Sequence, residues 1–285
     1  MTDAFTEHAQ LLHTESDRFT RYLQALPPQT WSQSTACDQW QVQDVVAHLI
    51  EVAQLYTHSV TRGVQGDAEP PEGRLPAGAV NASIVAERVA QRSIATRKRL
   101  GDELLETFEH TGAHLNRLFA ELSPEDRDKP CYHPGGIVPA RRFIDLRLKE
   151  LAMHEWDMRS PHESGFTLSR PCLPAILGLM TDSIASGSLR WGFWAGSRLS
   201  APVRYRVELT DPFPFQTDLV VEGDQVRVET AAENPAQVMM RCDAETFVLL
   251  VYGRLPLTSA LDSGRLIAEG DADHTAALAS WFRGV

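Results

Sequence analysis

The stretch ARRFIDLRLKELAMHEWDMRSP, residues 140–161, decides the fold of the first half of the chain. Within it Phe143, Arg147, Glu150, His154 and Asp157 follow one another at steps of four, three, four and three residues. Side chains at these steps share one face of an α-helix. Leucine, methionine and tryptophan residues flank this stripe, so its polar groups are expected to be buried and to need partners. The spacing predicts a helix over 140–159, closed by the proline at position 161.

Apolar residues at helical spacing predict further helices before and after this segment. We expect helices over 4–26, 41–62 and 82–121, with a looser helix over about 172–187. Several long helices joined by loops indicate a four-helix bundle, which we place in residues 1–190. The Gly- and Pro-rich segment 63–81 is long for a connection, and we interpret it as a lid or the rim of a site.

The pattern changes after Pro202, where β-branched residues alternate with polar ones. VRYRVEL, FQTDLVV, QVRVET and VMMRC are predicted strands, followed by helices over 244–253 and 273–282. We therefore predict a small α+β domain over residues 200–285, joined to the bundle by a segment that contains Trp191. The fold class is α+β with two domains.

Three polar side chains on two predicted helices form a candidate metal site. Glu150 and His154 are one helical turn apart, so both can reach one ion. His48 lies on an apolar stripe of the second helix that also contains Gln41, Val45, Val52 and Leu55, so it is expected to point into the bundle. Two imidazoles and one carboxylate leave an open coordination position, which catalysis requires.

The same three residues are also compatible with a polar core that holds no metal. A histidine on an apolar stripe is more often a hydrogen-bonded core residue, and Glu150 could form a salt bridge with Arg147. A second pair, His110 and His114, has the same spacing. Because its stripe is polar throughout, we expect this pair to face solvent.

Composition and charge exclude some classes of function. The formal net charge of -11 argues against binding to a nucleic-acid backbone, which needs a basic surface. The sequence contains no apolar run long enough for a transmembrane helix and begins without a basic, apolar leader, so we expect a cytoplasmic protein without membrane contact, a monomer or small homo-oligomer. Four dispersed cysteines form no CxxC pair and are expected to be reduced: Cys37, Cys131, Cys172 and Cys242.

Two motifs resemble signatures of the mycothiol-dependent maleylpyruvate isomerase family, which belongs to the DinB/YfiT-like metalloenzymes. In TACDQWQVQDVVAHLIE, residues 35–51, the matching positions are Cys37, Trp40, Asp44 and His48. In LKELAMHEWDMRSP, residues 148–161, they are Glu150, His154, Trp156 and Asp157. The resemblance implies a DinB-like bundle in which His48, Glu150 and His154 hold a divalent metal. Gln41 departs from the Ser or Thr that is common before this helix, which affects its cap and not the ligands.

The segment LLVYGRLPLTSALDSGRLIAEGDADHTAALASWF, residues 249–282, resembles the sterol-carrier-like domain that follows the bundle in many of these proteins. The family places a catalytic arginine from this domain near the metal. Arg254 in VYGRLP is our candidate, with Arg204 and Arg241 as alternatives.

The resemblance implies an enzyme whose cosubstrate is a low-molecular-weight thiol, mycothiol or a related compound, and whose second substrate is a small electrophile. We expect zinc, although two histidines and one carboxylate also suit nickel, iron or manganese. The interpretation that leads is a thiol-dependent isomerase. A mycothiol S-transferase is an alternative, and a non-enzymatic binding protein for a hydrophobic ligand is another.

Overall fold

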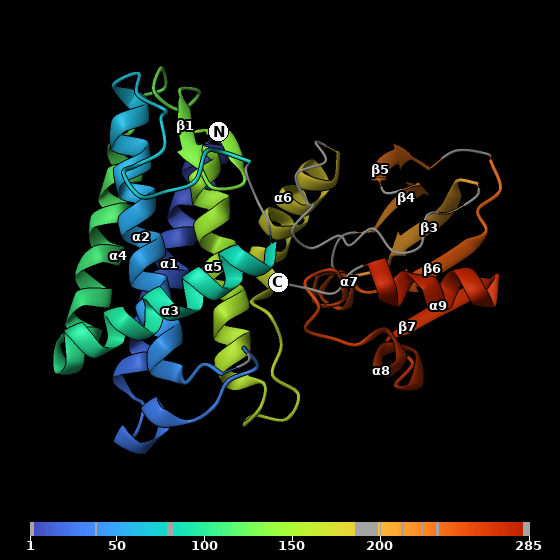
Figure 1. Ribbon diagram of the computed structural model, residues 1–285, viewed down its shortest axis with the longest axis horizontal. Coiled ribbons are helices and arrows are strands. Elements are labelled where there is room, and N and C mark those ends of the chain that lie inside the picture. The colour runs from blue at the N-terminus through green and yellow to red at the C-terminus, as the bar shows by residue number, and fades with distance from the viewer. Residues whose placement is uncertain are drawn as a thin grey trace. The chain divides into compact units, whose positions relative to one another are not determined.

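A computed structural model describes residues 3–37, 39–78, 82–185, 199, 201–211, 214–223, 225–231 and 234–281 (Figure 1). The chain divides into two compact units, Met1–Ala175 and Ile176–Val285. The predicted α+β class is confirmed, since helices make up most of the first unit and a five-stranded sheet with helices makes up most of the second. Trp191 lies outside the described residues. No helix in the described ranges is long and apolar enough to cross a membrane.

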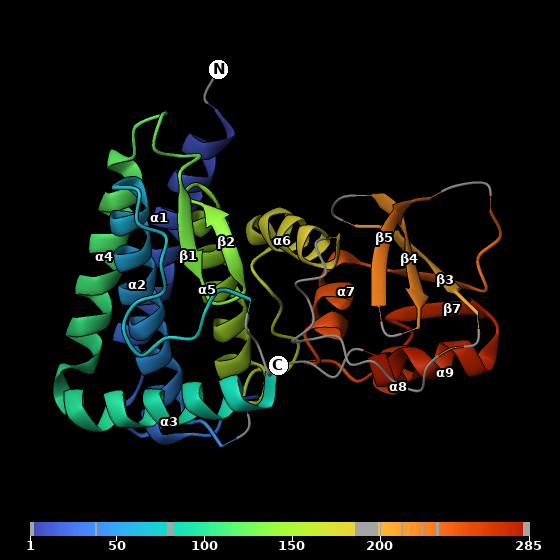
Figure 2. The same cartoon turned by 45° about the horizontal axis from the view of Figure 1, so that its top comes forward.

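Four helices of the first unit lie side by side and pack against one another (Figures 1 and 2). They are α1 (Ala4–Gln24), α2 (Val42–Val64), α4 (Leu104–Glu121) and α5 (Arg142–Arg159). A short 3-10 helix, η1 (Pro28–Ser32), follows α1. Phe19, Leu49, Leu115 and Phe143, one from each long helix, are fully buried and form the centre of the core. The apolar periodicity of the sequence thus predicted the bundle itself.

The helical segment predicted over 82–121, with Gly101 and Gly112 as possible bends, is two helices that separate at Gly101. α3 (Ala82–Leu100) and α4 are separated by a 3-10 turn, η2 (Gly101–Glu103). Gly101 has φ +53°, a left-handed conformation that favours glycine and ends α3. α3 then packs on α2, where the Thr96 hydroxyl donates to Glu51 at 2.7 Å and Arg97 Nε lies 3.2 Å from Asp44.

The segment that precedes α5 contains a hairpin. β1 (Pro130–His133) and β2 (Gly136–Pro139) pair antiparallel, and β1 packs against α2. A Cβ on Gly63 of α2 would collide with Cys131 Sγ and lie 2.8 Å from the Pro130 carbonyl oxygen. The Tyr132 hydroxyl donates to the Leu75 carbonyl at 2.7 Å and ties the 65–78 loop to this hairpin.

The second unit is built on a sheet with strand order β5-β4-β3-β6-β7. β3 pairs parallel with β6, and the other pairs are antiparallel. The strands are β3 (Val203–Leu209), β4 (Phe215–Glu222), β5 (Gln225–Thr230), β6 (Val238–Cys242) and β7 (Leu266–Gly270). A 3-10 turn (Arg170–Cys172) lies near the end of the first unit, and α6 (Leu173–Ala185) begins in the first unit and continues into the second. The other helices of the second unit are α7 (Ala244–Val251), α8 (Leu257–Asp262) and α9 (Ala272–Trp281). β7 and α8 were not predicted from the sequence.

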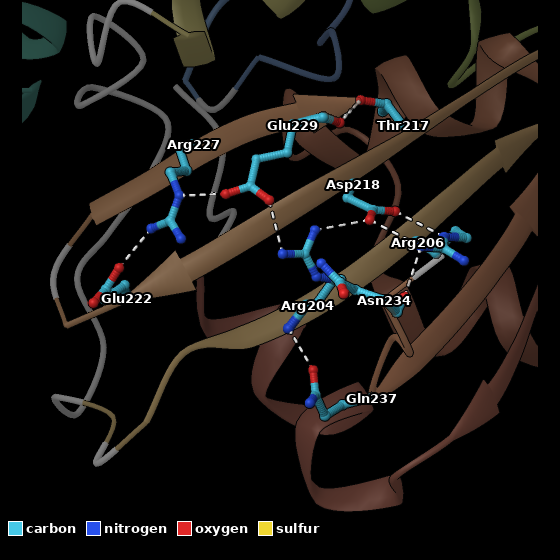
Figure 3. A network of polar contacts seen from close by, with 9 residues as sticks. All are labelled: Arg204, Arg206, Thr217, Asp218, Glu222, Arg227, Glu229, Asn234 and Gln237. Atoms are coloured by element: carbon cyan, nitrogen blue, oxygen red, sulfur yellow. Dashed lines mark hydrogen bonds and ion pairs between the residues drawn. The ribbon is translucent and has the colours of Figure 1, made fainter. Parts of the chain in front are cut away.

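The two faces of this sheet differ in chemistry. Val203, Tyr205, Val207 and Leu209 of β3 are buried, and Tyr205 donates to the His274 carbonyl of α9 at 2.9 Å. This face borders an apolar cavity of about 250 Å³. On the opposite face arginines and carboxylates form the network in Figure 3.

At the centre of that network the carboxylate of Asp218 is fully buried and accepts hydrogen bonds from two guanidinium groups. Arg204 Nη1 donates to it at 2.8 Å and Arg206 Nε at 2.8 Å (Figure 3). Burial raises the pKa of Asp218, but the two arginines outweigh burial and lower it below its ordinary value.

The close approach of α2 and β1 predicts opposite effects for two glycine substitutions. Gly63→Ala should destabilise the first unit by about 1–3 kcal/mol, because its Cβ meets the hairpin backbone. Gly112→Ala should stabilise it by about 0.5–1 kcal/mol, since Gly112 lies inside α4 with no atom within 4 Å of the added carbon. Urea unfolding followed by circular dichroism measures both. Equal effects of the two substitutions would contradict the packing described.

Asp218→Asn should destabilise the second unit by about 2 kcal/mol near pH 7, because hydrogen bonds from two guanidinium groups lose their charged acceptor. The folded-state pKa of Asp218 is lowered. Its stabilisation is therefore complete above the unfolded pKa of about 3.9 and is lost as pH falls through the folded value. Thermal unfolding between about pH 2 and 7 should show a smaller acid destabilisation for Asp218→Asn. Glu222→Gln, which changes an exposed partner of Arg227, is the control.

Candidate metal centre

The start of α2 determines where His48 lies. Asp44 accepts a hydrogen bond from the Gln41 backbone N–H at 3.0 Å and so stabilises the first turn of the helix. His48 follows one turn later. Because Val45 and Leu49 on either side are fully buried, the helix is held against the core and the imidazole is directed toward α5.

The side chains of His48, Glu150 and His154 meet between α2 and α5. Oε2 of Glu150 lies 3.3 Å from His48 Nε2 and 3.3 Å from His154 Nε2. The three potential ligand atoms are all within 4.8 Å of one another. Glu150 and His154 are 9% exposed, so these groups are largely removed from solvent.

The remaining contacts of Glu150 fix its orientation. Lys149 Nζ lies 2.7 Å from Oε1, which leaves Oε2 facing the two imidazoles. Arg147 donates to the Leu49 carbonyl of α2 at 2.9 Å and is 2% exposed. The ion pair considered between Glu150 and Arg147 is therefore replaced by one between Glu150 and its neighbour Lys149.

Asp157 orients His154 from the side opposite Glu150. Its Oδ2 lies 3.0 Å from His154 Nδ1 and accepts from Cys37 Sγ at 3.1 Å. A carboxylate on Nδ1 fixes the tautomer in which Nε2 carries the lone pair, as is usual for metal-binding histidines. Cys37 is half buried beside this pair.

The pKa values in this cluster are shifted by burial and by charge. Burial lowers the pKa of His48, which keeps its imidazole neutral and able to bind a cation. Burial acts against ionisation of Glu150, but Lys149 and the two histidines outweigh it and hold the pKa well below its usual range. Burial also lowers the pKa of His154, but hydrogen bonds with Asp157, Cys37 and Glu150 raise it overall. The surroundings of His154 therefore favour positive charge on or beside its imidazole, from a proton or from a bound cation.

These residues fit a divalent metal. Two imidazole nitrogens and one carboxylate oxygen converge on one point, and this donor set suits zinc and related ions. Cys37, His154 and Asp157 form a second group with suitable spacing. We favour the first group, because Asp157 already accepts hydrogen bonds from His154 and Cys37 and so serves to orient them.

One side of the site is covered and the other opens into a cavity. The Trp40 ring, 8% exposed, packs 5.2 Å from the His48 ring and 6.3 Å from that of His154, measured between centroids. His48 and Glu150 line a cavity of about 190 Å³. The other lining groups come from α2, from α3, from the 65–78 loop and from the β1 hairpin. A small substrate can therefore reach the point where the three ligand atoms meet.

The other sequence candidates belong to other elements of the chain. His110 and His114 are exposed on α4, as their polar stripe predicted. In the second unit Arg254 follows Gly253 at the end of α7, and its Nη1 donates to the Tyr252 carbonyl at 3.0 Å. Arg204 is held by Asp218 and Glu229, and Arg241 by Glu208.

His133, Arg74 and Arg92 are among the cavity-lining residues that were not predicted from the sequence. His133 comes from the hairpin, Arg74 from the 65–78 loop and Arg92 from α3. Burial lowers the pKa of His133 to about 4, so it is neutral near pH 7. The sequence indicated Arg74 only indirectly, because that residue lies in the 63–81 segment, which we interpreted as a lid or the rim of a site. No periodicity connects these three residues, since they come from three different segments.

The contact between Asp157 and His154 predicts the effect of one substitution on metal affinity. Asp157→Asn should weaken zinc binding by about 10- to 100-fold, because the imidazole loses the carboxylate that fixes its tautomer. Competition with a chromophoric chelator measures the affinity. Glu163→Gln, which changes a carboxylate paired with Arg159 near the end of α5, should leave it unchanged. Equal zinc affinity in the wild type and Asp157→Asn would remove Asp157 from the site.

Comparisons with known proteins agree with this architecture. The domain family described as "Mycothiol maleylpyruvate isomerase N-terminal domain" matches residues 12–159, and the "SCP-2 sterol transfer family" matches residues 197–283. A crystal structure of the mycothiol-dependent maleylpyruvate isomerase is 17% identical, covers 95% of this chain and 98% of its own, and has a TM-score of 0.62.

A histidine-to-alanine mutant of that enzyme gives 16% identity, the same coverage and a TM-score of 0.60. At this identity both structures support the fold alone. No curated protein matches the chain. Because the first domain match spans more than half of the sequence, the chain belongs to the mycothiol maleylpyruvate isomerase family of enzymes.

Proposed function

We propose that this protein is a metal- and thiol-dependent isomerase acting on a maleylpyruvate-type substrate, with mycothiol or a related thiol as cosubstrate. The observation that carries the proposal is the convergence of His48, Glu150 and His154 on one point beside a cavity. Family membership supports the choice of thiol and of reaction class. We also propose that residues 1–190 and 200–285 are the two domains and that the protein acts in the cytoplasm as a monomer or small homo-oligomer.

His48, Glu150 and His154 would hold the metal, and we expect zinc. A divalent ion there supplies positive charge that favours the thiolate over the thiol near neutral pH. Asp157 keeps Nδ1 of His154 occupied, so that Nε2 faces the site. Lys149 engages one oxygen of Glu150 and directs the other inward. These contacts limit the movement of the three ligands.

The surroundings of the triad suit an addition reaction. Trp40 covers the two imidazoles and excludes water from that side. Addition of the thiolate to one carbon of the substrate's double bond leaves a single bond that can rotate. Elimination of the same thiolate then restores the double bond in the other geometry, so the thiol is regenerated and no atom is gained or lost.

Arg254 remains our candidate for a catalytic arginine from the second domain, on the strength of the resemblance of VYGRLP. A guanidinium group can bind a substrate carboxylate through two parallel hydrogen bonds. An S-transferase is the second candidate for the reaction, because it shares the first step. It differs in that the thioether is released and the thiol is consumed.

The test measures metal and reaction on the same preparations. Zinc-loaded wild-type protein should convert maleylpyruvate to its geometric isomer with catalytic amounts of mycothiol. His48→Ala and Glu150→Gln should each lose the bound metal, measured by elemental mass spectrometry, and at least about a hundredfold of the rate, since metal assistance contributes several kcal/mol. His114→Ala, which changes an exposed histidine on α4, should keep both.

The results separate the candidates. A thioether that accumulates in proportion to the thiol consumed would support the S-transferase. Full metal content and activity in His48→Ala would refute the metal site. Metal binding without turnover of any electrophile would reject the isomerase while leaving the metal site in place.

A further inference from the structure

The cavity beside the triad contains more positive charge than the metal ligands explain. Arg74, Arg88 and Arg92 line it together with His48 and Glu150. They come from the 65–78 loop and from α3, so two separate segments of the chain bring guanidinium groups to one small space. The protein as a whole has a net charge of -11, so this cavity concentrates positive charge against the overall balance of the chain.

Arg92 of α3 forms an ion pair with Glu51 of α2. Its Nε lies 3.4 Å from Glu51 Oε2, and Glu51 accepts from Thr96 at 2.7 Å and from Ser93 at 3.4 Å. Glu51 therefore has three partners and is shared among them. Glu51 is the carboxylate that forms an ion pair with Arg92. The Arg92 side chain is 40% exposed and lines the cavity.

Arg74 is half buried without such a partner. No carboxylate among the residues that the structure describes forms an ion pair with it, although its backbone N–H donates to the Pro71 carbonyl. Burial lowers the pKa of Arg74 and repulsion from Arg92 lowers it further, and the opposing attraction of Glu51 does not outweigh them. A guanidinium in this position remains charged at neutral pH and is stabilised by an anion brought to it.

Tyr132 shows that the two guanidinium groups converge. Burial raises the pKa of its hydroxyl, and Arg74 and Arg92 both act in the opposite direction on this one group. The hydroxyl donates to the Leu75 carbonyl, which fixes the loop next to Arg74. The loop that carries Arg74 is thus anchored on the hairpin that also contributes His133 to the cavity.

We propose that Arg74 and Arg92 form a carboxylate-binding subsite that positions an anionic substrate beside the metal triad. This inference rests on the proposed function and adds residues of the first domain that select the substrate, independently of Arg254. Two guanidinium groups suit a planar carboxylate, to which each can donate paired hydrogen bonds. The electrophile selected would therefore be an unsaturated acid with at least one carboxylate, its double bond reaching toward the point shared by His48 and Glu150.

The experiment measures binding without turnover. Maleate, an unreactive dicarboxylate in the absence of thiol, is titrated calorimetrically into zinc-loaded protein at low salt. Arg74→Gln and Arg92→Gln should each weaken binding by about tenfold or more, because each removes charge-assisted hydrogen bonds. Arg74→Lys, which keeps the charge but not the fork, should lose less. Arg99→Gln removes the same charge from an exposed position on α3 outside the cavity and is the matched control.

Two further probes check the chemistry. Dimethyl maleate, which is neutral, should be unaffected by either substitution. Inorganic phosphate should bind more weakly than maleate, and equally tight phosphate binding would reject a carboxylate-specific subsite. Absence of maleate binding to the wild type, or equal affinity in wild type, Arg74→Gln and Arg92→Gln, would overturn the proposal. Zinc content and circular dichroism of each variant show that its triad and fold are intact.

The two proposals fail in different ways. If maleylpyruvate is isomerised and Arg74→Gln leaves its KM unchanged, the subsite is wrong and the proposed function stands. If Arg74→Gln abolishes maleate binding but no preparation isomerises the substrate, the subsite stands and the reaction is wrong. A rise in KM for Arg74→Gln with little change in kcat supports both.

Discussion

The first unit depends on how one buried carboxylate is compensated. Glu150 is 9% exposed, and burying an isolated carboxylate is costly unless charges or hydrogen bonds offset it. Two imidazoles lie 3.3 Å from one of its oxygens and an ammonium group 2.7 Å from the other. α2 and α5 must therefore be placed so that His48 meets Glu150, and this requirement links the packing of the bundle to its chemistry.

A second layer of contacts extends from that arrangement. Asp157, fully buried, holds His154 through Nδ1 and reaches back to Cys37 before α2. The backbone N–H of Ala36 donates to the Asp157 carbonyl at 2.7 Å. The segment that precedes α2 is thus tied to the end of α5, and the Cys, Trp, His and Asp positions of the two motifs meet in space because they support one cluster.

Features that depend on residues close together in the sequence could be predicted, and features that depend on contacts between distant segments could not. The stripe of α5 and the position of His48 obey helical spacing, which is a local property, and β3 obeys strand alternation. Gly101 and Gly112 were both possible bends, and only Gly101 takes the left-handed conformation that ends α3. The β1 hairpin lies among prolines and glycines that equally suit a loop. Arg74 and Arg92 reach the cavity through the docking of a loop and of α3, so no spacing in the sequence predicts their meeting.

The overall charge of the protein and the charge of the cavity have opposite signs, and distance decides which of them an anion experiences. At physiological ionic strength the Debye length is about 8 Å, so most exposed acidic side chains are screened from a substrate inside the cavity. Arg74 and Arg92 line the cavity, so their charges lie close to an anion bound there and are screened less by solvent and salt. Glu51 and Glu150, the carboxylates that line the same cavity, are engaged by Arg92 and Lys149. An acidic protein can therefore present a locally cationic site, and the net charge that argues against a nucleic-acid partner leaves a small carboxylate as a suitable ligand.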